Sequence, residues 1–287
     1  MTRYFWQLQM LLMKNFVLTV FVISAFINAD AQYYYSDIVG TKQTNQQYRM
    51  LRAFQYKRIN AASFDGSSQL SKDFLLEQTI ADDGRKIITH SATVGNMESY
   101  FISNYQNNKV NKTVDSGNNA INTVTYEYDN TGKVISTSAT SKDFDGTFTN
   151  QERHMWSYND KGLPQKMIKI KNQNDTTLVT FTYEDDNVAE ERWTKNNRVI
   201  ETYYYYYNSK KQLTDIVRFS RKAKAMLPDY IFEYDTKGRI TQMIQTQNGS
   251  ANYLVWKYTY NENGMKEKEI VFNKQKEMLG RVEYKYQ

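Results

Sequence analysis

The chain has 287 residues, and its formal net charge of +6 is spread thinly along the sequence, which argues against a nucleic-acid partner. It contains no cysteine, which excludes disulfides, thiolate metal sites, a cysteine nucleophile and a lipid-modified N-terminal cysteine. Aromatic residues make up 15% of the sequence, and its tyrosine, threonine, valine and phenylalanine favour strands, so the composition predicts an all-β fold.

The first predicted element is an export signal in residues 1–31. An apolar run, FVLTVFVISAFI (16–27), precedes the small-x-small tripeptide at 29–31, and we expect cleavage before Gln32. The run is short for a membrane span, so a retained anchor helix is the less favoured alternative. A start at Met13 would give a signal of ordinary length. We therefore predict a secreted protein of the periplasm or the extracellular space.

The remaining residues, 32–287, are predicted to form a single domain of repeats. The pattern apolar-x-aromatic-x-Tyr, followed by Asp or Asn, two polar residues and usually Gly, recurs every 24 to 30 residues. The repeats are clear over 124–287 and weaker over 50–123. The key tyrosines of the clear copies are Tyr128, Tyr158, Tyr183, Tyr207, Tyr234, Tyr260 and Tyr286.

Each copy predicts a β-hairpin. A period of two places three large side chains on one face of a strand. The polar cluster suits a three-residue loop with Asp or Asn first and a left-handed residue last. Gly usually takes the last position; Asn187 takes it in one copy, and Lys211 suits it poorly, so we expect the turn after Tyr207 to be strained or built differently. The pairs Asp145-Gly146 and Asp65-Gly66 predict tight type I′ turns.

The hairpins cannot stand alone, because a two-stranded hairpin is marginally stable in water. Neighbouring copies must share their aromatic faces, giving one antiparallel meander of about twenty strands, and open sheets seldom exceed about ten strands without curling or closing. The predicted fold is therefore all-β: a strongly curled, barrel-like or spiral meander sheet with its aromatic side inward.

Two segments, YEYDNTGKV (126–134) and FEYDTKGRI (232–240), carry a family resemblance. They resemble the YD repeats of RHS proteins, teneurins and insecticidal toxin shells, and residues 50–287 as a whole resemble secreted Bacteroidota proteins with porin-like or curled β-meander folds. The resemblance implies a β scaffold associated with carbohydrate or surface binding, and no chemistry. Because the sequence ends inside a repeat, we expect no toxin cargo after it.

Residues that could carry chemistry are few. His154 occupies an inward position and is expected to be a packed, hydrogen-bonded core residue, whereas no partner can be argued for His90. Two histidines without cysteine argue against a zinc site. The acidic groups at 82–83 and 184–186 fall in predicted turns, which explains them without catalysis, and oxygen-rich turns such as 129–131 lack the spacing of a calcium loop. We predict no enzyme activity, no metal and no cofactor.

Five consecutive tyrosines (203–207) predict a contact surface. Alternation places three of them on the inner face and leaves Tyr204 and Tyr206 on the otherwise polar outer face. With Trp193 nearby, they are candidate stacking residues for a sugar or a protein partner. The alternative is that they only cover the neighbouring strand around Trp193.

The basic segment RFSRKAKAM (218–226) is the second candidate. Arg218, Arg221 and Lys222 are candidate contacts for an anionic glycan or lipopolysaccharide, and the alternative is a solvated loop. The predicted function is a secreted, non-enzymatic binding or scaffold protein for a glycan or another surface protein.

Two other functions remain open from the sequence. An integral outer-membrane β-barrel needs an apolar outer face, yet the face opposite the aromatic side chains is polar, so we expect no stable membrane insertion. A secreted hydrolase is disfavoured because no acid/base pair can be argued.

Overall fold

The computed structural model describes residues 32–287 except 73, 94–96, 118–119, 222 and 247–251, so the predicted export signal and Lys222 lie outside the described residues. Two helical segments come first, η2 (Tyr34–Gly40) and α2 (Thr41–Ala53). Eighteen strands follow in one sheet. They are β1 (Arg58–Asp65), β2 (Leu75–Ile80), β3 (Lys86–Thr93), β4 (Met97–Gln106), β5 (Lys109–Ser116), β6 (Ala120–Tyr128), β7 (Val134–Asp143), β8 (Thr149–Tyr158), β9 (Pro164–Lys171), β10 (Asp175–Glu184), β11 (Asn187–Lys195), β12 (Arg198–Tyr207), β13 (Leu213–Ser220), β14 (Ala225–Tyr234), β15 (Ile240–Thr246), β16 (Tyr253–Tyr260), β17 (Lys266–Phe272) and β18 (Met278–Tyr286).

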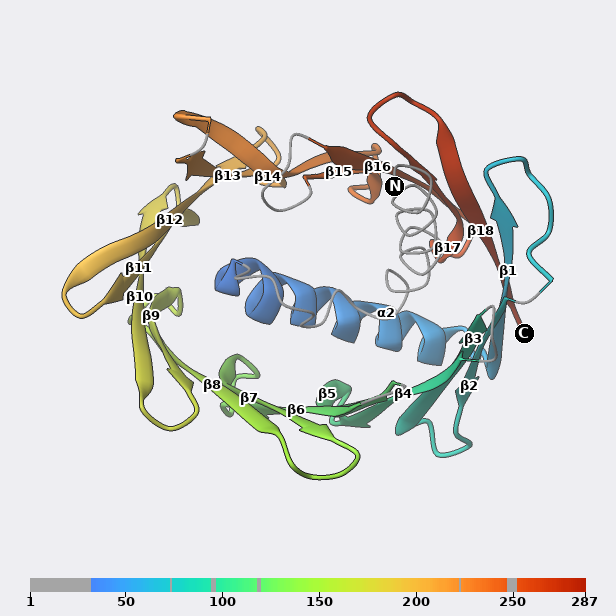
Figure 1. Ribbon diagram of the computed structural model, residues 1–287, viewed down its shortest axis with the longest axis horizontal. Helices are drawn as coiled ribbons and strands as arrows, with labels where there is room; N and C mark the ends of the chain where they lie inside the picture. The colour runs from blue at the N-terminus through green and yellow to red at the C-terminus, as the bar shows by residue number, and fades with distance from the viewer. Residues whose placement is uncertain (1–31, 73, 94–96, 118–119, 222, 247–251) are drawn as a thin grey trace, which may run out of the picture.

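The sheet closes into a barrel. Each strand pairs antiparallel with the next, and β1 pairs with β18 over seven residue pairs, from Ile59↔Tyr286 to Asp65↔Gly280. Figure 1 shows the resulting flattened ring. The predicted all-β meander is confirmed, and of the two predicted forms the barrel is the one observed.

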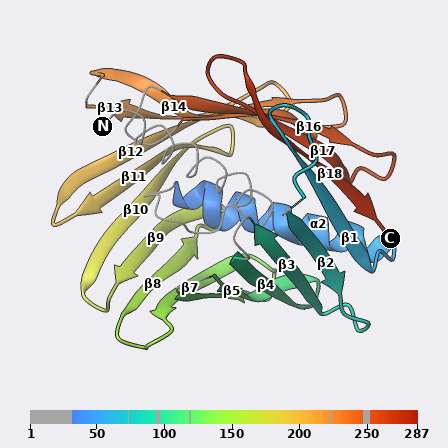
Figure 2. The ribbon, with the colours of Figure 1, turned by 45° about the vertical axis from the view of Figure 1, so that its right-hand side comes forward.

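The helical segment lies inside the barrel, in the space that we call the lumen (Figures 1 and 2). Barrels of this strand number are wide enough to leave a channel when nothing fills them, so the lumen accommodates a helix about 10–12 Å across. No helix was predicted for this part of the sequence. The buried residues of α2 are Thr41, Asn45, Tyr48 and Leu51, which recur at helical spacing and combine polar with apolar side chains.

The turns at one end of the barrel follow the repeat pattern. In the β6–β7 turn, the Asp129 carboxylate accepts the backbone N–H groups of Thr131 and Lys133, each at 2.9 Å, and Gly132 has a φ of +90°. The predicted turn, closed by a left-handed residue, is confirmed here. We call this end, which carries the β2–β3 turn and every second turn after it, the tyrosine end. The opposite end is the far end.

The β12–β13 turn is built like its neighbours although it lacks glycine. Lys211 takes the glycine position with a φ of +58°, and its N–H bonds the Asn208 carbonyl as in the other copies. The turn is therefore strained rather than differently built. The β10–β11 turn differs: Glu184 pairs directly with Asn187, and Asp185 and Asp186 both have positive φ, a two-residue type I′ turn. The placement of Asn187 at the left-handed position was wrong.

The two type I′ turns predicted at the far end were also wrong. Gly146 has positive φ but Asp145 does not, and in the β1–β2 loop the left-handed residue is Ser68. In both loops an aspartate at the end of the strand accepts N–H groups from the loop, Asp143 from Phe148 and Asp65 from Ser67, which favours a type I turn instead.

The repeat tyrosines connect successive hairpins. Their side chains point into the barrel, and in six of the seven clear copies, all but that of Tyr207, the hydroxyl donates a hydrogen bond to a backbone carbonyl at or near the start of a neighbouring hairpin's return strand. The donor–acceptor pairs are Tyr128 with Val110, Tyr158 with Val134, Tyr183 with Pro164, Tyr234 with Leu213, Tyr260 with Ile240, and Tyr286 with Lys266. Each bond contributes about 0.5–1.5 kcal/mol, which explains why tyrosine and not phenylalanine recurs at this position.

Three clusters of buried side chains form the described core. One packs α2 against the strands from β1 to β6 and against β18, the second surrounds η2 and spans β7 to β14, and the third lies between β16 and β17. The helical segment thus joins the two larger clusters. Across the part of the chain that the structure describes, no helix is both long enough and apolar enough to cross a membrane.

Candidate functional site

The start of the helical segment is held by one buried carboxylate, Glu191 of β11. Its two oxygens accept the backbone N–H groups of Tyr33 (2.8 Å) and Tyr34 (3.0 Å). The indole of Trp193 (2.7 Å) and the hydroxyl of Tyr205 (2.6 Å) donate to the same carboxylate. An anion at the first turn of a helix accepts N–H groups that have no partner within the helix. Burial raises the pKa of Glu191, and these four donors lower it in part.

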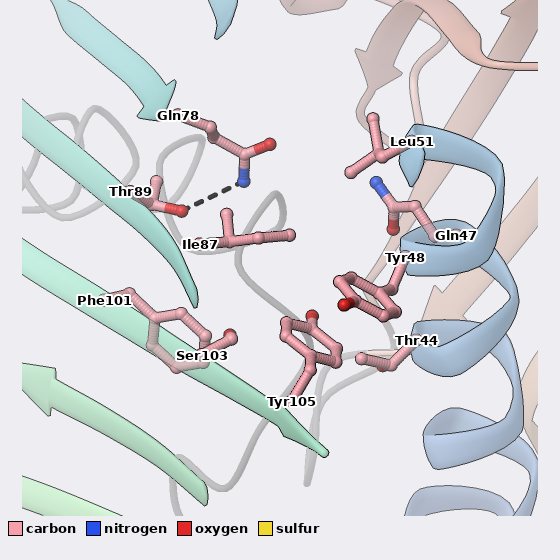
Figure 3. Close-up of a pocket in the computed structure, with 10 residues that line it drawn as sticks. All are labelled: Thr44, Gln47, Tyr48, Leu51, Gln78, Ile87, Thr89, Phe101, Ser103 and Tyr105. Carbon is pink, nitrogen blue, oxygen red and sulfur yellow. Dashed lines mark hydrogen bonds between the residues drawn. The ribbon is translucent and has the colours of Figure 1, made fainter. Parts of the chain in front are cut away.

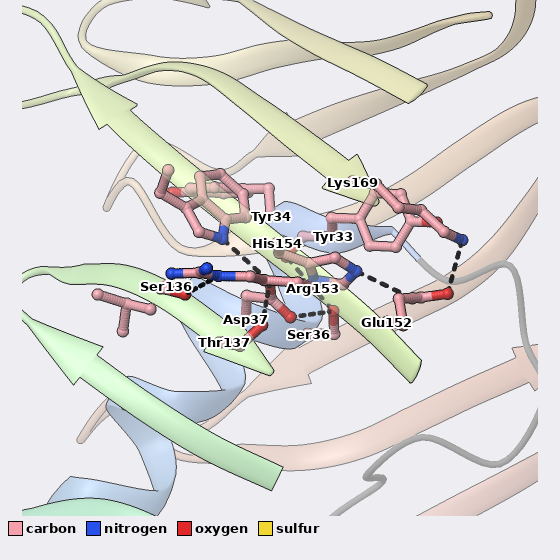
Figure 4. Close-up of polar contacts among 12 residues, drawn as sticks. Tyr33, Tyr34, Ser36, Asp37, Ser136, Thr137, Glu152, Arg153, His154 and Lys169 are labelled. Carbon is pink, nitrogen blue, oxygen red and sulfur yellow. Dashed lines mark hydrogen bonds and ion pairs between the residues drawn. The ribbon is translucent and has the colours of Figure 1, made fainter. Parts of the chain in front are cut away.

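The next anchor is Asp37 of η2, which is completely buried (Figure 4). Its carboxylate contacts Nδ1 of His154 at 2.7 Å and accepts the indole N–H of Trp156 at 3.0 Å. The other ring nitrogen of His154 lies 2.9 Å from Glu152, which pairs with Lys169 at 3.1 Å. A chain of alternating charges therefore runs from the helix to the barrel wall.

The protonation of His154 follows from this chain. Burial alone would lower the pKa of His154, but the carboxylates of Asp37 and Glu152 outweigh it and raise the pKa to about 9. Burial likewise opposes the effect of His154 and Lys169 on Glu152, whose pKa is lowered to about 2. His154 is therefore an imidazolium at neutral pH, with both nitrogens bonded. The expectation of a packed, hydrogen-bonded histidine is confirmed.

The second half of the helical segment is anchored near the tyrosine end. The amide oxygen of Asn45 accepts the N–H of Val110 at 2.8 Å, and the hydroxyl of Tyr48 donates to the Gly84 carbonyl at 2.7 Å. The rings of Tyr48 and Tyr105 stack with centroids 3.7 Å apart. These contacts tie α2 to two strands, β4 and β5, and to the β2–β3 turn.

A small cavity lies beside this contact (Figure 3). Its volume is about 40 Å³, and Tyr48, Tyr105, Gln78 and Thr89 are among its lining residues. The side-chain amide of Gln78 donates to the hydroxyl of Thr89 at 3.0 Å. Small-molecule sites occupy about 300–1,000 Å³, so this cavity has room for water and not for a sugar.

These interior groups hold the helix and are poorly suited to chemistry. His154, Asp37 and Glu191 are each at most 2% exposed and bonded on every reactive atom, so a substrate would have to displace the helix to reach them. Within the described ranges, no group of three or more His, Asp or Glu side chains is placed to hold a metal ion.

The aromatic residues predicted for binding lie on opposite faces. Tyr206 is on the outer wall and 51% exposed, and Tyr204 is partly buried beside it. Trp193 lies inside the barrel, stacked on Tyr33 with centroids 4.4 Å apart. Trp193 therefore cannot form one surface with Tyr204 and Tyr206. Tyr204 lies opposite Glu190 of the neighbouring strand β11, and the alternative that the two tyrosines cover this strand also stays a prediction. Binding at Tyr204 and Tyr206 stays a prediction.

The basic segment is also divided. Arg218 points into the lumen, where its guanidinium pairs with Asp229 (3.1 Å) and Glu201 (3.6 Å). Arg221, by contrast, is exposed at the β13–β14 turn of the far end. The two arginines therefore belong to different environments, and only Arg221 faces solvent.

Exposed apolar and basic side chains gather near Arg221 at the far ends of two adjacent hairpins, β11–β12 and β13–β14; Phe219 and Met226 pair on the outer face, and Leu227 lies opposite Arg218 at the rim of the lumen. We call this surface the far-end patch; it consists of Val199, Ile200, Phe219, Met226, Leu227, Arg198, Arg221 and Lys224. The five apolar side chains are 41–56% exposed. Among the described residues no ion pair neutralises its three cations, and the far-end carboxylate of the adjacent strand β10, Asp175, is paired with Lys195 at 2.6 Å.

The outer wall of the barrel carries charged side chains in cross-strand pairs. Arg58–Glu77 (3.0 Å) and Lys268–Glu283 (3.2 Å) join neighbouring strands in this way, and Arg192–Glu190 (2.9 Å) is a further pair within β11. A wall facing lipid would need apolar side chains at these outward positions. The polar outer face expected from the sequence is thus present on strands far apart in the ring.

Several functional contacts were missed by sequence reasoning. Asp37 and Glu191 were not singled out, although a charged residue at an inward position of an aromatic strand, as in EERW (190–193), is a readable signal. His90, for which no partner was predicted, lies 3.4 Å from Glu98 and stacks on Tyr100. Pairing of this kind depends on strand register and has no signal in the local sequence.

No protein-family model matches the sequence, and no curated protein matches it, so the resemblance to YD repeats stays a prediction. Among solved structures, a porin-like protein from Bacteroides uniformis is similar with a TM-score of 0.37 and 10% identity, over 81% of this chain and 98% of that one. A porin-like protein from Bacteroides vulgatus is similar with a TM-score of 0.28 and 11% identity, over 81% and 98%. The Tc holotoxin pore of Photorhabdus luminescens is similar with a TM-score of 0.30 and 11% identity, over 74% of this chain and 14% of that one.

Proposed function

We propose that the protein is an exported, non-catalytic binding module that attaches through its far-end patch to the anionic face of a lipid layer. The observation that supports this most strongly is the patch itself: five exposed apolar side chains beside three cations, on two neighbouring hairpin ends. Exposed apolar surface of this kind, bordered by charge, is typical of contact sites.

The chemistry of the patch favours an anionic amphiphile over a neutral sugar. Fully burying an aliphatic or aromatic side chain contributes about 1.5–3 kcal/mol, so the half-exposed side chains of the patch contribute about 1 kcal/mol each. A cation beside an anionic membrane contributes about 1 kcal/mol. Five apolar residues and three cations together give about 8 kcal/mol before the cost of orienting the protein, which predicts weak, salt-sensitive attachment.

The rest of the barrel supports attachment rather than insertion. Its outer wall carries ion pairs such as Lys268–Glu283, which a bilayer core would strip of water. Its lumen is crossed by a helix that is anchored at Glu191 and Asp37, so the barrel serves as a rigid scaffold that presents the hairpin ends. Binding of a sugar at Tyr206 is a second, independent proposal, supported by the exposure of that ring.

Sedimentation with lipid vesicles tests the proposal. The mature protein should sediment with phosphatidylcholine vesicles that contain phosphatidylglycerol, should not do so with phosphatidylcholine alone, and should be released by salt. Phe219→Ser with Leu227→Ser, and separately Arg221→Glu with Lys224→Glu, should each weaken sedimentation about tenfold or more.

The matched control is Ile135→Ser, which changes an exposed apolar residue at the tyrosine end and should leave sedimentation unchanged. Circular dichroism checks that each variant is folded. Absence of sedimentation, or equal sedimentation by the parent and both patch variants, would overturn the proposal. Binding to a lipid-free anionic polysaccharide without binding to vesicles would also overturn it, and would identify a glycan as the ligand.

A further inference from the structure

Glu191 is a buried carboxylate that lacks a cation. Across the described part of the chain it forms no ion pair; its partners are the backbone N–H groups of Tyr33 and Tyr34 and the side chains of Trp193 and Tyr205. Moving a carboxylate out of water without a counter-charge is costly. Asp37, by comparison, has His154 as its cation.

Among the described residues around Tyr203, carboxylates outnumber cations; Lys169, which contacts the Tyr33 hydroxyl, is paired with Glu152. Glu191, Glu201, Asp229 and Arg218 all act on the pKa of Tyr203, which burial raises first of all, so these four charges surround one ring. Three are carboxylates, and Arg218 is paired with two of them. The third carboxylate, Glu191, lies beside the first residues of the segment.

Gln32 lies next to these carboxylates. It is 3% exposed, and its side-chain amide donates to Asp229 at 2.7 Å. Its carbonyl accepts the N–H of Ser36 at 2.9 Å, so its backbone already belongs to the helical segment. Gln32 is also the residue that the sequence predicts to become the first of the exported chain.

We propose that export cleavage before Gln32 creates an α-ammonium group that the barrel captures, with Glu191 as its counter-charge and Asp229 holding the Gln32 side chain. A signal peptidase supplies the step: water splits the Ala31–Gln32 amide, Ala31 leaves with a carboxylate and Gln32 keeps the ammonium group. The inference rests on the export part of the proposed function and is independent of the far-end patch.

Capture has a chemical consequence. An N-terminal glutamine ordinarily cyclises when its free amine attacks its own side-chain amide and ammonia leaves. In the barrel the amine is held protonated beside a carboxylate, and the amide is fixed on Asp229. Gln32 should therefore persist as an open, uncyclised residue in the folded protein.

Mass spectrometry and amine labelling of the exported protein test this. The intact mass should correspond to residues 32–287 without loss of ammonia, and a reagent specific for α-amines should react about 100-fold more slowly with the native than with the urea-unfolded protein. A chain that begins elsewhere, a cyclised Gln32, or an amine that reacts equally in both states would overturn the capture.

A pair of variants identifies the counter-charge. Glu191→Gln keeps the shape of the side chain and removes its charge, and should raise the native labelling rate about tenfold or more. Asp143→Asn, in an exposed far-end loop, is the matched control and should leave the rate unchanged. If Glu191→Gln does not fold, the comparison of native and urea-unfolded parent protein still tests whether the amine is captured.

The outcomes separate the two proposals. A chain that begins at Gln32 but has a reactive amine contradicts capture and leaves export intact. A chain that begins elsewhere contradicts the processing step. Vesicle sedimentation through the far-end patch is unaffected by either result.

Discussion

Replacing His154 tests the ionic chain that fastens the helix to the wall. His154 is an imidazolium between Asp37 and Glu152, and its pKa is raised from 6.5 to about 9 in the folded protein. A group whose pKa is raised on folding stabilises the protein fully below its unfolded pKa and loses that contribution as the pH rises through its folded pKa. The loss should therefore fall between pH 6.5 and about 9.

The magnitude follows from the size of the shift. The difference between 6.5 and about 9 is 2.5 pH units. At 1.36 kcal/mol per unit this corresponds to about 3 kcal/mol. Glu152, whose pKa is lowered to about 2, stays ionised throughout this pH range, so its titration adds nothing to the predicted pH dependence.

The assay is urea unfolding of the parent and of His154→Gln at pH 6 and at pH 9.5. Glutamine keeps hydrogen-bonding atoms near both carboxylates but cannot carry a charge. The difference in unfolding free energy between parent and variant should be larger at pH 6 by about 3 kcal/mol and should shrink steadily as the pH rises. If the difference in unfolding free energy is the same at both pH values, His154 is neutral throughout and the charged pair with Asp37 is contradicted.

Two further predictions concern the repeat itself. Tyr234→Phe removes the hydroxyl that donates to the Leu213 carbonyl of β13, and it should lower the unfolding free energy measured in urea by about 1 kcal/mol. Tyr206→Phe on the outer wall is the control and should change this free energy little. Equal effects of the two substitutions would contradict the role of the inward hydroxyls. Lys211→Gly removes the strain of a lysine with positive φ and should raise the melting temperature by an amount that corresponds to about 0.5 kcal/mol of stability. Lys210→Gly, at the neighbouring position, is the control and should lower the melting temperature by a similar amount. A loss of stability in both variants would show that the turn is not strained.

The barrel could be predicted because its signals are local. Alternation of aromatic and polar residues sets which face of each strand is buried, and an Asp or Asn followed by Gly sets the turn. The number of strands then makes a flat sheet impossible. Closure by β1 and β18 joins residues at opposite ends of the repeat array, and the sequence left the choice between barrel and spiral open for that reason.

The helical segment and the luminal residues that hold it could not be predicted in the same way. The partners of the helical segment lie far away in sequence: Asp37 and His154 are 117 residues apart, and Tyr33 and Glu191 are 158 residues apart. The stabilisation combines these polar contacts with the packing of Tyr33, Tyr48 and Leu51 into the two larger core clusters, whose other members are also distant in sequence. Nothing in the segment alone distinguishes it from a further weak repeat or a linker.

The faces of single side chains were predicted unevenly for a related reason. Tyr204 and Tyr206 follow directly from alternation within one strand. Trp193 was grouped with them because it was expected on the neighbouring strand. Its face is set by the pairing of β11 with β12, in which Glu191 lies opposite the inward Tyr203 and Trp193 opposite Glu201, and this register has no signal in the local sequence.

An environment-sensitive fluorophore on a single engineered cysteine tests the functional account most directly. The sequence has no cysteine, so Phe219→Cys at the far end and Ile135→Cys at the tyrosine end each give one labelling site. With vesicles containing phosphatidylglycerol, attachment through the far-end patch predicts a blue shift in the fluorescence emission of the label at position 219 and no change at position 135. A shift at position 135 alone, an equal shift at both positions, or no shift at either would contradict attachment through the far-end patch.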